Sequence, residues 1–272
     1  MSRLRRYGRW ADAHIHLDLY EEHEREPLLR RAFGQGGIAA VVAVSMHRSS
    51  CETNRRLARL FPGHVHPAYG FHPEQPLPPE AELDALVAWI EARAAEGEEF
   101  AVGEVGLPYY ARTEAEKAGR RFDEAPYAAL LERFVRLAAK LGRPIVLHAV
   151  YEDAAKACDL LERYGVRRAH FHWFKGPEAT VRRMIANGYA VSVTPDVLYE
   201  AEIRELVRAY PLELLMTETD GPWPFEGPFA GRRTAPEMTR RVAAEIAAVK
   251  GLPVPEVEER LLANALTFYG LS

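Results

Sequence analysis

Short apolar runs alternate with helical patterns along the whole sequence of 272 residues. Eight of these runs are candidate strands: Trp10–His16, Ala39–Val44, Val65–Gly70, Ala101–Gly106, Pro144–His148, Ala169–His172, Ala190–Val193 and Leu214–Thr217. Strands that alternate with helices form parallel sheets, and eight is the number of strands that closes a (β/α)8 barrel. The sequence therefore predicts an α/β fold, a TIM barrel, as a single domain over residues 1–272.

Apolar residues at three- and four-residue spacing indicate the helices between these strands. The clearest patterns cover Glu82–Ala95, Tyr127–Leu141, Arg204–Tyr210, Thr239–Val249 and Glu256–Tyr269. The charged stretch Arg112–Glu124 is interpreted as exposed. An open, doubly wound sheet is the alternative fold, but no glycine-rich nucleotide-binding loop follows any candidate strand.

Composition limits the classes of partner and location. The net charge is −4, so there is no global positive charge to hold nucleic acid. No apolar run reaches the roughly 18 residues of a membrane span. The basic segment 1–7 lacks the apolar core of a secretory signal. We expect Cys51 and Cys158 to be free thiols and the protein to be cytoplasmic, with no membrane association. The sequence indicates no protein partner.

Histidines and acids lie where the candidate strands end. In an extended strand, residues two apart face the same way, so His14 and His16 share a face. Further residues of this kind end later strands: His72, Glu104, His148, His170, His172 and Asp220. Active sites of (β/α)8 barrels lie at the carboxyl ends of the strands. We therefore expect most of these side chains to converge.

Imidazoles and carboxylates together suit Zn²⁺, Mn²⁺, iron or cobalt better than an all-oxygen calcium site. A carboxylate such as Glu104 is able to bridge two metal ions. The sequence contains no Gly-x-Ser-x-Gly motif, and neither cysteine ends a strand, so nothing indicates a serine or cysteine nucleophile.

Six ordered motifs give the chain a resemblance to the TatD family of metal-dependent hydrolases, the TatD-type deoxyribonucleases of the amidohydrolase-like barrels. They are Asp12–Asp18, Gly70–Pro73, Gly103–Leu107, Leu147-His148, His172–Gly176 and Glu218–Pro222. Asn264-Ala265 near the end also fits the family pattern. The resemblance covers nearly the whole chain.

The resemblance implies a centre with one or two divalent metal ions, such as Mg²⁺, Mn²⁺ or Zn²⁺. The first metal would be held by His14, His16, Glu104 and Asp220. The second would be held by Glu104, His148 and His172, with Glu104 bridging and Asp220 also acting as general base. His72 corresponds to a family histidine that contacts substrate phosphate, and His170 is a neighbour of the site. The implied reaction is hydrolysis of a phosphodiester in DNA.

The sequence departs from the family pattern around the expected substrate. Pro108 stands where the family usually has Asp, and Val150 stands where it usually has Arg. Lys175 replaces a usual Ser, and the segment Arg233–Pro236 lacks a usual Asn. The missing Arg removes a phosphate contact. Lys175, which we expect to bind substrate, could compensate together with Arg232 and Arg233.

Three functions remain open at this point. The first is a phosphodiesterase or deoxyribonuclease, the second a metal-dependent hydrolase of a small ester, lactone or amide, and the third a non-catalytic barrel. Aromatic residues at the expected rim either stack on bases or pack loops: Tyr109, Tyr110, Trp173, Phe174, Trp223 and Phe225. The histidines outside the motifs are interpreted as surface or loop residues: His23, His47, His64 and His66.

Overall fold

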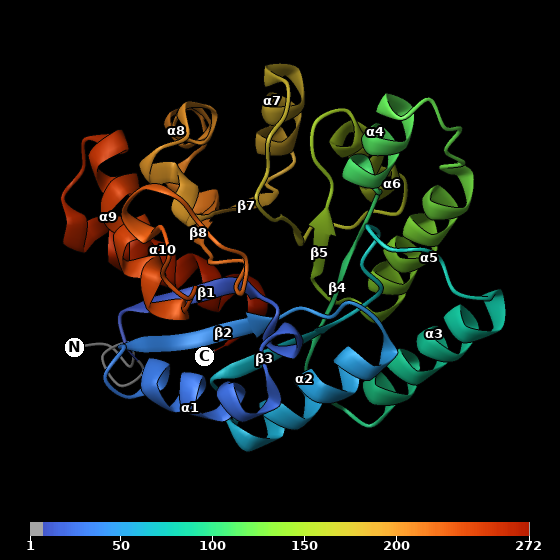
Figure 1. The fold of residues 1–272 in the computed structure, drawn as a ribbon, viewed down its shortest axis with the longest axis horizontal. Coiled ribbons are helices and arrows are strands. Elements are labelled where there is room, and N and C mark those ends of the chain that lie inside the picture. The colour runs from blue at the N-terminus through green and yellow to red at the C-terminus, as the bar shows by residue number, and fades with distance from the viewer. Residues whose placement is uncertain (1–7, 272) are drawn as a thin grey trace.

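The computed structural model describes residues 8–271 and contains one sheet of eight parallel strands in the order of the chain (Figure 1). The strands are β1 (Trp10–Ile15), β2 (Ile38–Ala43), β3 (Val65–Tyr69), β4 (Ala101–Gly106), β5 (Ile145–His148), β6 (Ala169–Phe171), β7 (Ala190–Val193) and β8 (Leu215–Thr217). Each strand pairs with the next one in the sequence. The predicted eight-stranded parallel architecture is confirmed. The basic segment 1–7, interpreted above as no secretory signal, lies outside the described residues.

The last strand returns beside the first, so the sheet forms a nearly closed barrel. The hydroxyl of Thr217 donates to the carbonyl of Ala11 at 2.7 Å. Beyond the strand ends, the amide of Asp220 donates to the carbonyl of His14 at 2.9 Å, and the amide of His16 donates to that of Gly221 at 2.8 Å. These bonds place the residues after β8 directly beside those that end β1. The open-sheet alternative is thereby excluded.

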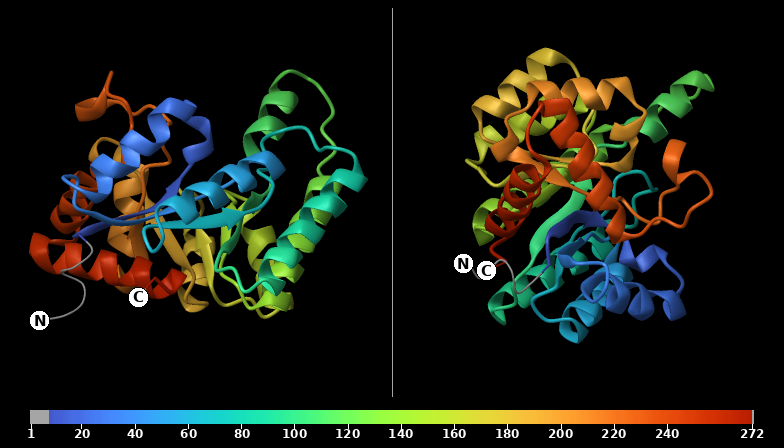
Figure 2. Two further views of the ribbon diagram at one scale, coloured as in Figure 1. Left: turned by 90° about the horizontal axis from the view of Figure 1, so that it is seen from below. Right: turned by 90° about the vertical axis from the view of Figure 1, so that its left-hand side faces the viewer.

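Helices surround the barrel (Figure 2), and all of those described except the last two connect its strands. They are α1 (Glu22–Phe33), α2 (Arg48–Leu60), α3 (Glu80–Ala95), α4 (Tyr109–Lys117), α5 (Ala125–Leu141), α6 (Asp153–Arg163), α7 (Glu178–Ala186), α8 (Ala201–Ala209), α9 (Thr239–Lys250) and α10 (Val254–Tyr269). The five predicted helical patterns correspond to α3, α5, α8, α9 and α10, with starts that differ by up to three residues. None of the helices in residues 8–271 combines the length and the apolarity that a membrane crossing requires.

Helix α10 covers the amino-terminal end of the barrel. Its residues Leu262, Ala265 and Tyr269 pack in one buried cluster with small side chains of the strands, among them Ala11 and Ala101. Bulkier residues instead fill the space between the strands and the outer helices. This closure leaves the carboxyl ends of the strands as the open face of the barrel.

The charged stretch Arg112–Glu124 is mostly exposed, as predicted, and its first part is helical, because α4 extends to Lys117. The guanidinium of Arg112 anchors this helix, with Nη2 donating to Asp153 Oδ1 at 3.0 Å. One interpretation was wrong: His66 is not a surface or loop residue but is buried in β3 beside Tyr269, at a ring-centroid distance of 5.5 Å. Burial lowers the pKa of His66 to about 4.

Candidate metal centre

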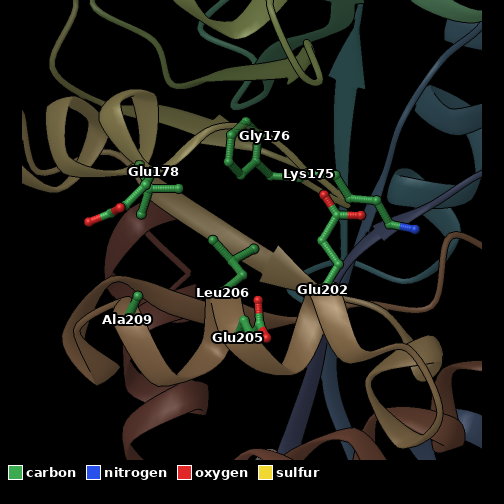
Figure 3. A pocket seen from close by; sticks show the side chains of 9 residues that line it. Lys175, Gly176, Glu178, Glu202, Glu205, Leu206 and Ala209 are labelled. Atoms are coloured by element: carbon green, nitrogen blue, oxygen red, sulfur yellow. The ribbon is translucent and has the colours of Figure 1, made fainter.

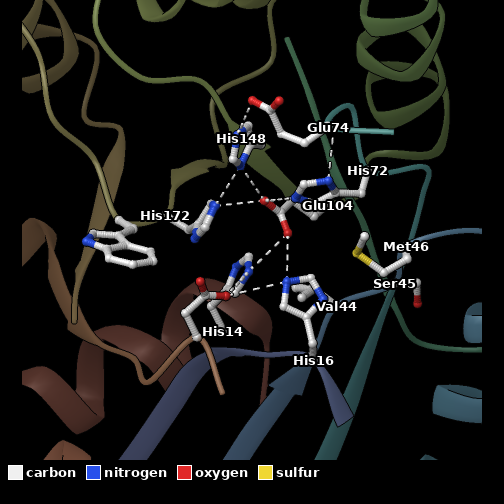
Figure 4. A network of polar contacts seen from close by, with 12 residues as sticks. His14, His16, Val44, Ser45, Met46, His72, Glu74, Glu104, His148 and His172 are labelled. Carbon is white, nitrogen blue, oxygen red and sulfur yellow. Dashed lines mark hydrogen bonds and ion pairs between the residues drawn. The ribbon is translucent and has the colours of Figure 1, made fainter. Parts of the chain in front are cut away.

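The polar residues at the strand ends converge at the carboxyl face of the barrel. His14 lies in β1, Glu104 in β4 and His148 at the end of β5. The remaining members follow strands directly or after a short loop: His16, His72, His172 and Asp220. All seven side chains are buried, and the five histidines surround the carboxylate of Glu104 (Figure 4).

One oxygen of Glu104 faces the group from β1 and β8. Its Oε2 atom lies 3.1 Å from Nε2 of His14 and 3.2 Å from Nε2 of His16. The Oδ1 atom of Asp220 lies 3.4 Å from each of these two nitrogens. Four donor atoms therefore meet on this side of the carboxylate.

The other oxygen of Glu104 faces three histidines. Its Oε1 atom lies 2.7 Å from Nε2 of His172, 2.9 Å from Nδ1 of His148 and 3.3 Å from Nε2 of His72. His148 and His172 also approach each other, with Nδ1 and Nε2 3.2 Å apart. The carboxylate of Glu104 thus separates two groups of donors, as its predicted bridging position requires.

Glycines on both sides of Glu104 let β4 approach β5 closely enough for this arrangement. Gly103 has a φ of +138°, and a Cβ atom there would lie 2.6 Å from the carbonyl oxygen of Val146. A Cβ atom on Gly106 would lie only 1.8 Å from the carbonyl oxygen of His148. A side chain at either position would push β5, and with it His148, away from Glu104.

Mutual contacts shift the pKa values of the whole cluster. Burial alone would lower the pKa of His16, but Asp220 and Glu104 outweigh it and raise the value to about 9. The same balance raises the pKa of His148 to about 9, through Glu104 and Glu74. Burial opposes ionisation of Glu104, yet the surrounding histidines, His172 first among them, hold its pKa well below the usual range. Protonated His14, His16 and His148, whose pKa values are raised, therefore offset the negative charge of Glu104.

The donor atoms of the cluster fit a divalent cation. Several of them are buried and make no hydrogen bond of acceptable geometry with the residues described, namely His14 Nε2, Glu104 Oε2 and Asp220 Oδ1. Buried polar atoms without partners are costly unless an ion or water satisfies them. Three sets have donor atoms close enough together to hold a metal ion: His14, His16 and Glu104; His14, His172 and Asp220; and His72, Glu104 and His148. Mixed imidazole and carboxylate donors suit transition metals and Zn²⁺.

Glu218 is a buried acid for which the sequence analysis predicted no role. Its hydrogen bonds support the cluster. Its Oε1 atom accepts a hydrogen bond from the backbone amide of Trp173 at 2.7 Å, and its Oε2 atom accepts one from Ser192 at 2.6 Å. Ser192 lies 2.5 Å from Nε2 of His170, whose Nδ1 atom lies 2.6 Å from the hydroxyl of Tyr269. Burial raises the pKa of Glu218 to about 8. His170 belongs to this supporting chain and not to the group around Glu104.

A second acid without a predicted role, Glu74, follows His72 by two residues. Its Oε1 atom lies 3.2 Å from Nε2 of His148, on the far side of the ring from Glu104. The same carboxylate accepts hydrogen bonds of 2.8 Å from the amides of Tyr110 and Ala111 at the start of α4. Glu74 therefore orients His148 and fixes α4 over the site. Only its proximity to His72 in the sequence could have indicated this position.

The cluster lies in the wall of a cavity of about 770 Å³. Cluster residues His16, His72, His148, His172 and Asp220 line it together with Leu19, Met46, Glu74, Tyr110, Glu114, Val150, Trp173, Pro222, Trp223 and Pro224. His72, the predicted substrate contact, therefore borders this cavity.

Lys175 does not line this cavity. It borders a smaller one of about 320 Å³ beside α7 and α8, where it lies near Glu202 (Figure 3). The predicted contact between Lys175 and substrate therefore finds no support in its position.

Comparisons with known proteins find similar chains over nearly the whole length. The family model described as TatD related DNase matches residues 11–270. A Haemophilus influenzae protein named uncharacterized metal-dependent hydrolase is 35% identical over 96% of this chain and 99% of its own length. The human protein named deoxyribonuclease TATDN3 is 29% identical over 95% of this chain and 94% of its own. Among solved structures, the TatD homologue YjjV of Escherichia coli superposes with a TM-score of 0.82 at 26% identity, covering 97% of this chain and 99% of its own.

Proposed function

The chain belongs to the TatD related DNase family of metal-dependent hydrolases, and from that premise we propose that the cluster around Glu104 hydrolyses phosphodiester bonds in DNA. The observation that carries the proposal is the pair of donor groups on the two oxygens of Glu104. The human relative named deoxyribonuclease TATDN3 supports DNA as the substrate.

We assign the first metal to His14, His16, Glu104 and Asp220, and the second to Glu104, His148 and His172. Mg²⁺, Mn²⁺ and Zn²⁺ are the candidate ions. A divalent ion there supplies a Lewis acid for the phosphoryl oxygen and lowers the pKa of water.

The remaining steps belong to side chains that face the cavity. The contacts with His14 and His16 outweigh burial and lower the pKa of Asp220, so its carboxylate is ionised at neutral pH and able to accept a proton. His72 faces Oε1 of Glu104 and borders the cavity, where its ring is able to contact a phosphoryl oxygen. Glu74 and Glu218 orient the ligands without facing the reacting bond directly.

Hydrolysis of a small ester, lactone or amide is the second candidate function. It is favoured by Val150, an apolar residue in the cavity wall. Val150 stands at the position where the family pattern described in the sequence analysis leads us to expect Arg. The structure does not favour the third alternative, a non-catalytic barrel. The buried donor atoms of the cluster that lack a hydrogen-bond partner fit a bound cation instead. We keep the cytoplasm as the expected location, in line with the buried free thiols Cys51 and Cys158.

Substrate class is testable with protein stripped of metal and then supplied with Mg²⁺, Mn²⁺ or Zn²⁺ in turn. End-labelled DNA, bis-p-nitrophenyl phosphate and a simple carboxylic ester form the substrate panel. We expect metal-dependent cleavage of the two phosphodiesters, lost in His14→Ala and kept in His23→Ala, a control at an exposed histidine. Cleavage of the carboxylic ester alone would reject the nuclease and keep the metal hydrolase.

A further inference from the structure

Three exposed apolar side chains surround the mouth of the cavity. Six large apolar residues among those described are strongly exposed, and three of them line this cavity: Leu19 at 51%, Tyr110 at 47% and Trp223 at 56%. Single exposed apolar residues are ordinary. Their concentration around one opening is characteristic of a binding surface.

Trp173 completes this group, which we call the apolar rim: Leu19, Tyr110, Trp173 and Trp223. The indole nitrogen of Trp173 donates to Asp196 at 2.6 Å, and its backbone amide donates to Glu218 at 2.7 Å. Its φ of +36° is unusual for a bulky residue. Strained backbone of this kind persists where the surroundings fix it, often at ligand-binding sites.

The apolar rim is connected to the metal centre by the chain itself. The amide of Trp223 donates to the carbonyl of Asp220 at 3.0 Å. The rings of Trp173 and Trp223 meet edge to face, with centroids 5.9 Å apart and planes at 70°. The chain therefore holds Trp223 beside Asp220, an assigned metal ligand, in the wall of the same cavity.

The charges at the mouth are unsuited to an extended polyanion. Among the described residues that line the cavity, none is Lys or Arg. The only charged residues there outside the cluster are Glu74, which is engaged with His148 and α4, and Glu114, which is exposed. Outside the metal centre, a series of phosphates along this opening would meet carboxylates and no Lys or Arg of the described lining.

We propose that the apolar rim binds a flat, apolar ring of the substrate beside the scissile bond, and that the cavity accommodates a single phosphoryl group. The proposal rests on the proposed function and narrows its substrate class. A volume of about 770 Å³ suits a ligand of this size. Two kinds of substrate carry such a flat ring: a terminal nucleobase and the ring of a non-nucleotide aryl ester.

Binding of two phosphonates to the metal-loaded protein tests the ring subsite. Phenylphosphonate and methylphosphonate carry the same acidic group and differ in the ring, so calorimetry with both isolates its contribution. We expect phenylphosphonate to bind about tenfold more tightly, the scale of one aromatic stacking contact. Trp223→Ala should abolish this preference, and Trp223→Phe should keep most of it.

The matched control is a pair of leucines of similar exposure. Leu19→Ala should reduce the preference for phenylphosphonate, whereas Leu60→Ala, at the end of α2 and outside the cavity lining, should leave it unchanged. Equal affinity for both phosphonates in the wild type would overturn the proposal. Equal weakening of both in Trp223→Ala would overturn it too, since the ring would then contribute nothing specific.

Nucleotide ligands distinguish the two sources of the ring. Their length tests whether the cavity accommodates only a single phosphoryl group. We expect thymidine 5′-phosphate to bind more tightly than its abasic analogue if the natural ring is a nucleobase, and equally if it is a non-nucleotide aryl group. Oligothymidylates of two and ten residues should bind equally, with little salt dependence. Tighter, salt-sensitive binding of the longer chain would refute the single-phosphoryl limit. A phenylphosphonate preference without any DNA cleavage would reject the nuclease but keep the ring subsite.

Discussion

His14 and His172 stack face to face, with ring centroids 3.8 Å apart and planes 9° apart, although they come from β1 and the end of β6. His14 faces one oxygen of Glu104 and His172 faces the other. Two charged rings would repel each other at this distance. Burial lowers the pKa of His172 to about 4, with the charge of His14 acting in the same direction. Burial also acts on His14, but Glu104 and Asp220 outweigh it and raise its pKa.

Metal binding should release protons. His16 and His148, with pKa values of about 9, are protonated at pH 7, whereas metal ligation requires neutral imidazole. Raising the pH from 7 to 9 removes the competing protons, so the apparent Kd should fall by about tenfold per pH unit for each proton displaced. Calorimetry at pH 7 in buffers of different ionisation enthalpy measures the release. A Kd independent of pH over this range would contradict the assignment.

The sequence predicted the barrel and the members of the cluster because both depend on local patterns. Strand-end histidines such as His148 stand out against apolar neighbours, and Glu104 stands out inside an apolar strand. The sequence could not show that Glu104 would present each oxygen to a different group, since this depends on the approach of β4 to β5. Helix α4 was missed because ion pairs of Arg112, and not an apolar face, attach it. The contact predicted between Lys175 and substrate stays a prediction, because the direction of this side chain after β6 depends on tertiary packing that the sequence does not show.

Glu218→Ala should impair the centre indirectly. The substitution leaves the amide of Trp173 and the hydroxyl of Ser192 without their acceptor. We expect a loss of about 1–3 kcal/mol in the free energy of unfolding and a decrease of about 10- to 100-fold in kcat, the range for residues that support metal ligands. Urea unfolding and steady-state kinetics measure the two effects. Wild-type values for Glu218→Ala would show that this acid supports nothing.

Gly106→Ala should destabilise the barrel strongly. The added methyl group would lie 1.8 Å from the carbonyl oxygen of His148, which belongs to the backbone and cannot rotate away. We expect a loss of at least about 2 kcal/mol from this overpacking. Gly97→Ala is the comparison, because nothing lies near its Cβ position and only its positive φ costs about 1 kcal/mol. Similar urea midpoints for the two variants would disprove the close approach of β4 and β5.

Lys175→Ala should leave the KM for a phosphodiester within about twofold of the wild type. Lys175 borders the smaller cavity beside α7 and α8 and is not among the described residues that line the cavity of the metal centre. A contact between its ammonium group and a phosphate would contribute a charge-assisted hydrogen bond, worth about tenfold or more. Steady-state kinetics with bis-p-nitrophenyl phosphate distinguish the two cases, and a tenfold rise in KM would restore the original prediction.

We propose that the carboxylate of Glu104 organises a metal centre, and the metal content of the purified protein tests this. Wild-type protein and Glu104→Gln are dialysed together against Mn²⁺ or Zn²⁺ and analysed by mass spectrometry of the bound metal. The amide keeps the shape of the side chain but loses the charge and one acceptor oxygen. We predict one or two ions per wild-type chain and less than about a tenth of that in the variant at the same free metal concentration, since losing a charged ligand weakens the site more than the 10- to 100-fold effect of a supporting residue. Equal metal content in the two proteins would contradict the account.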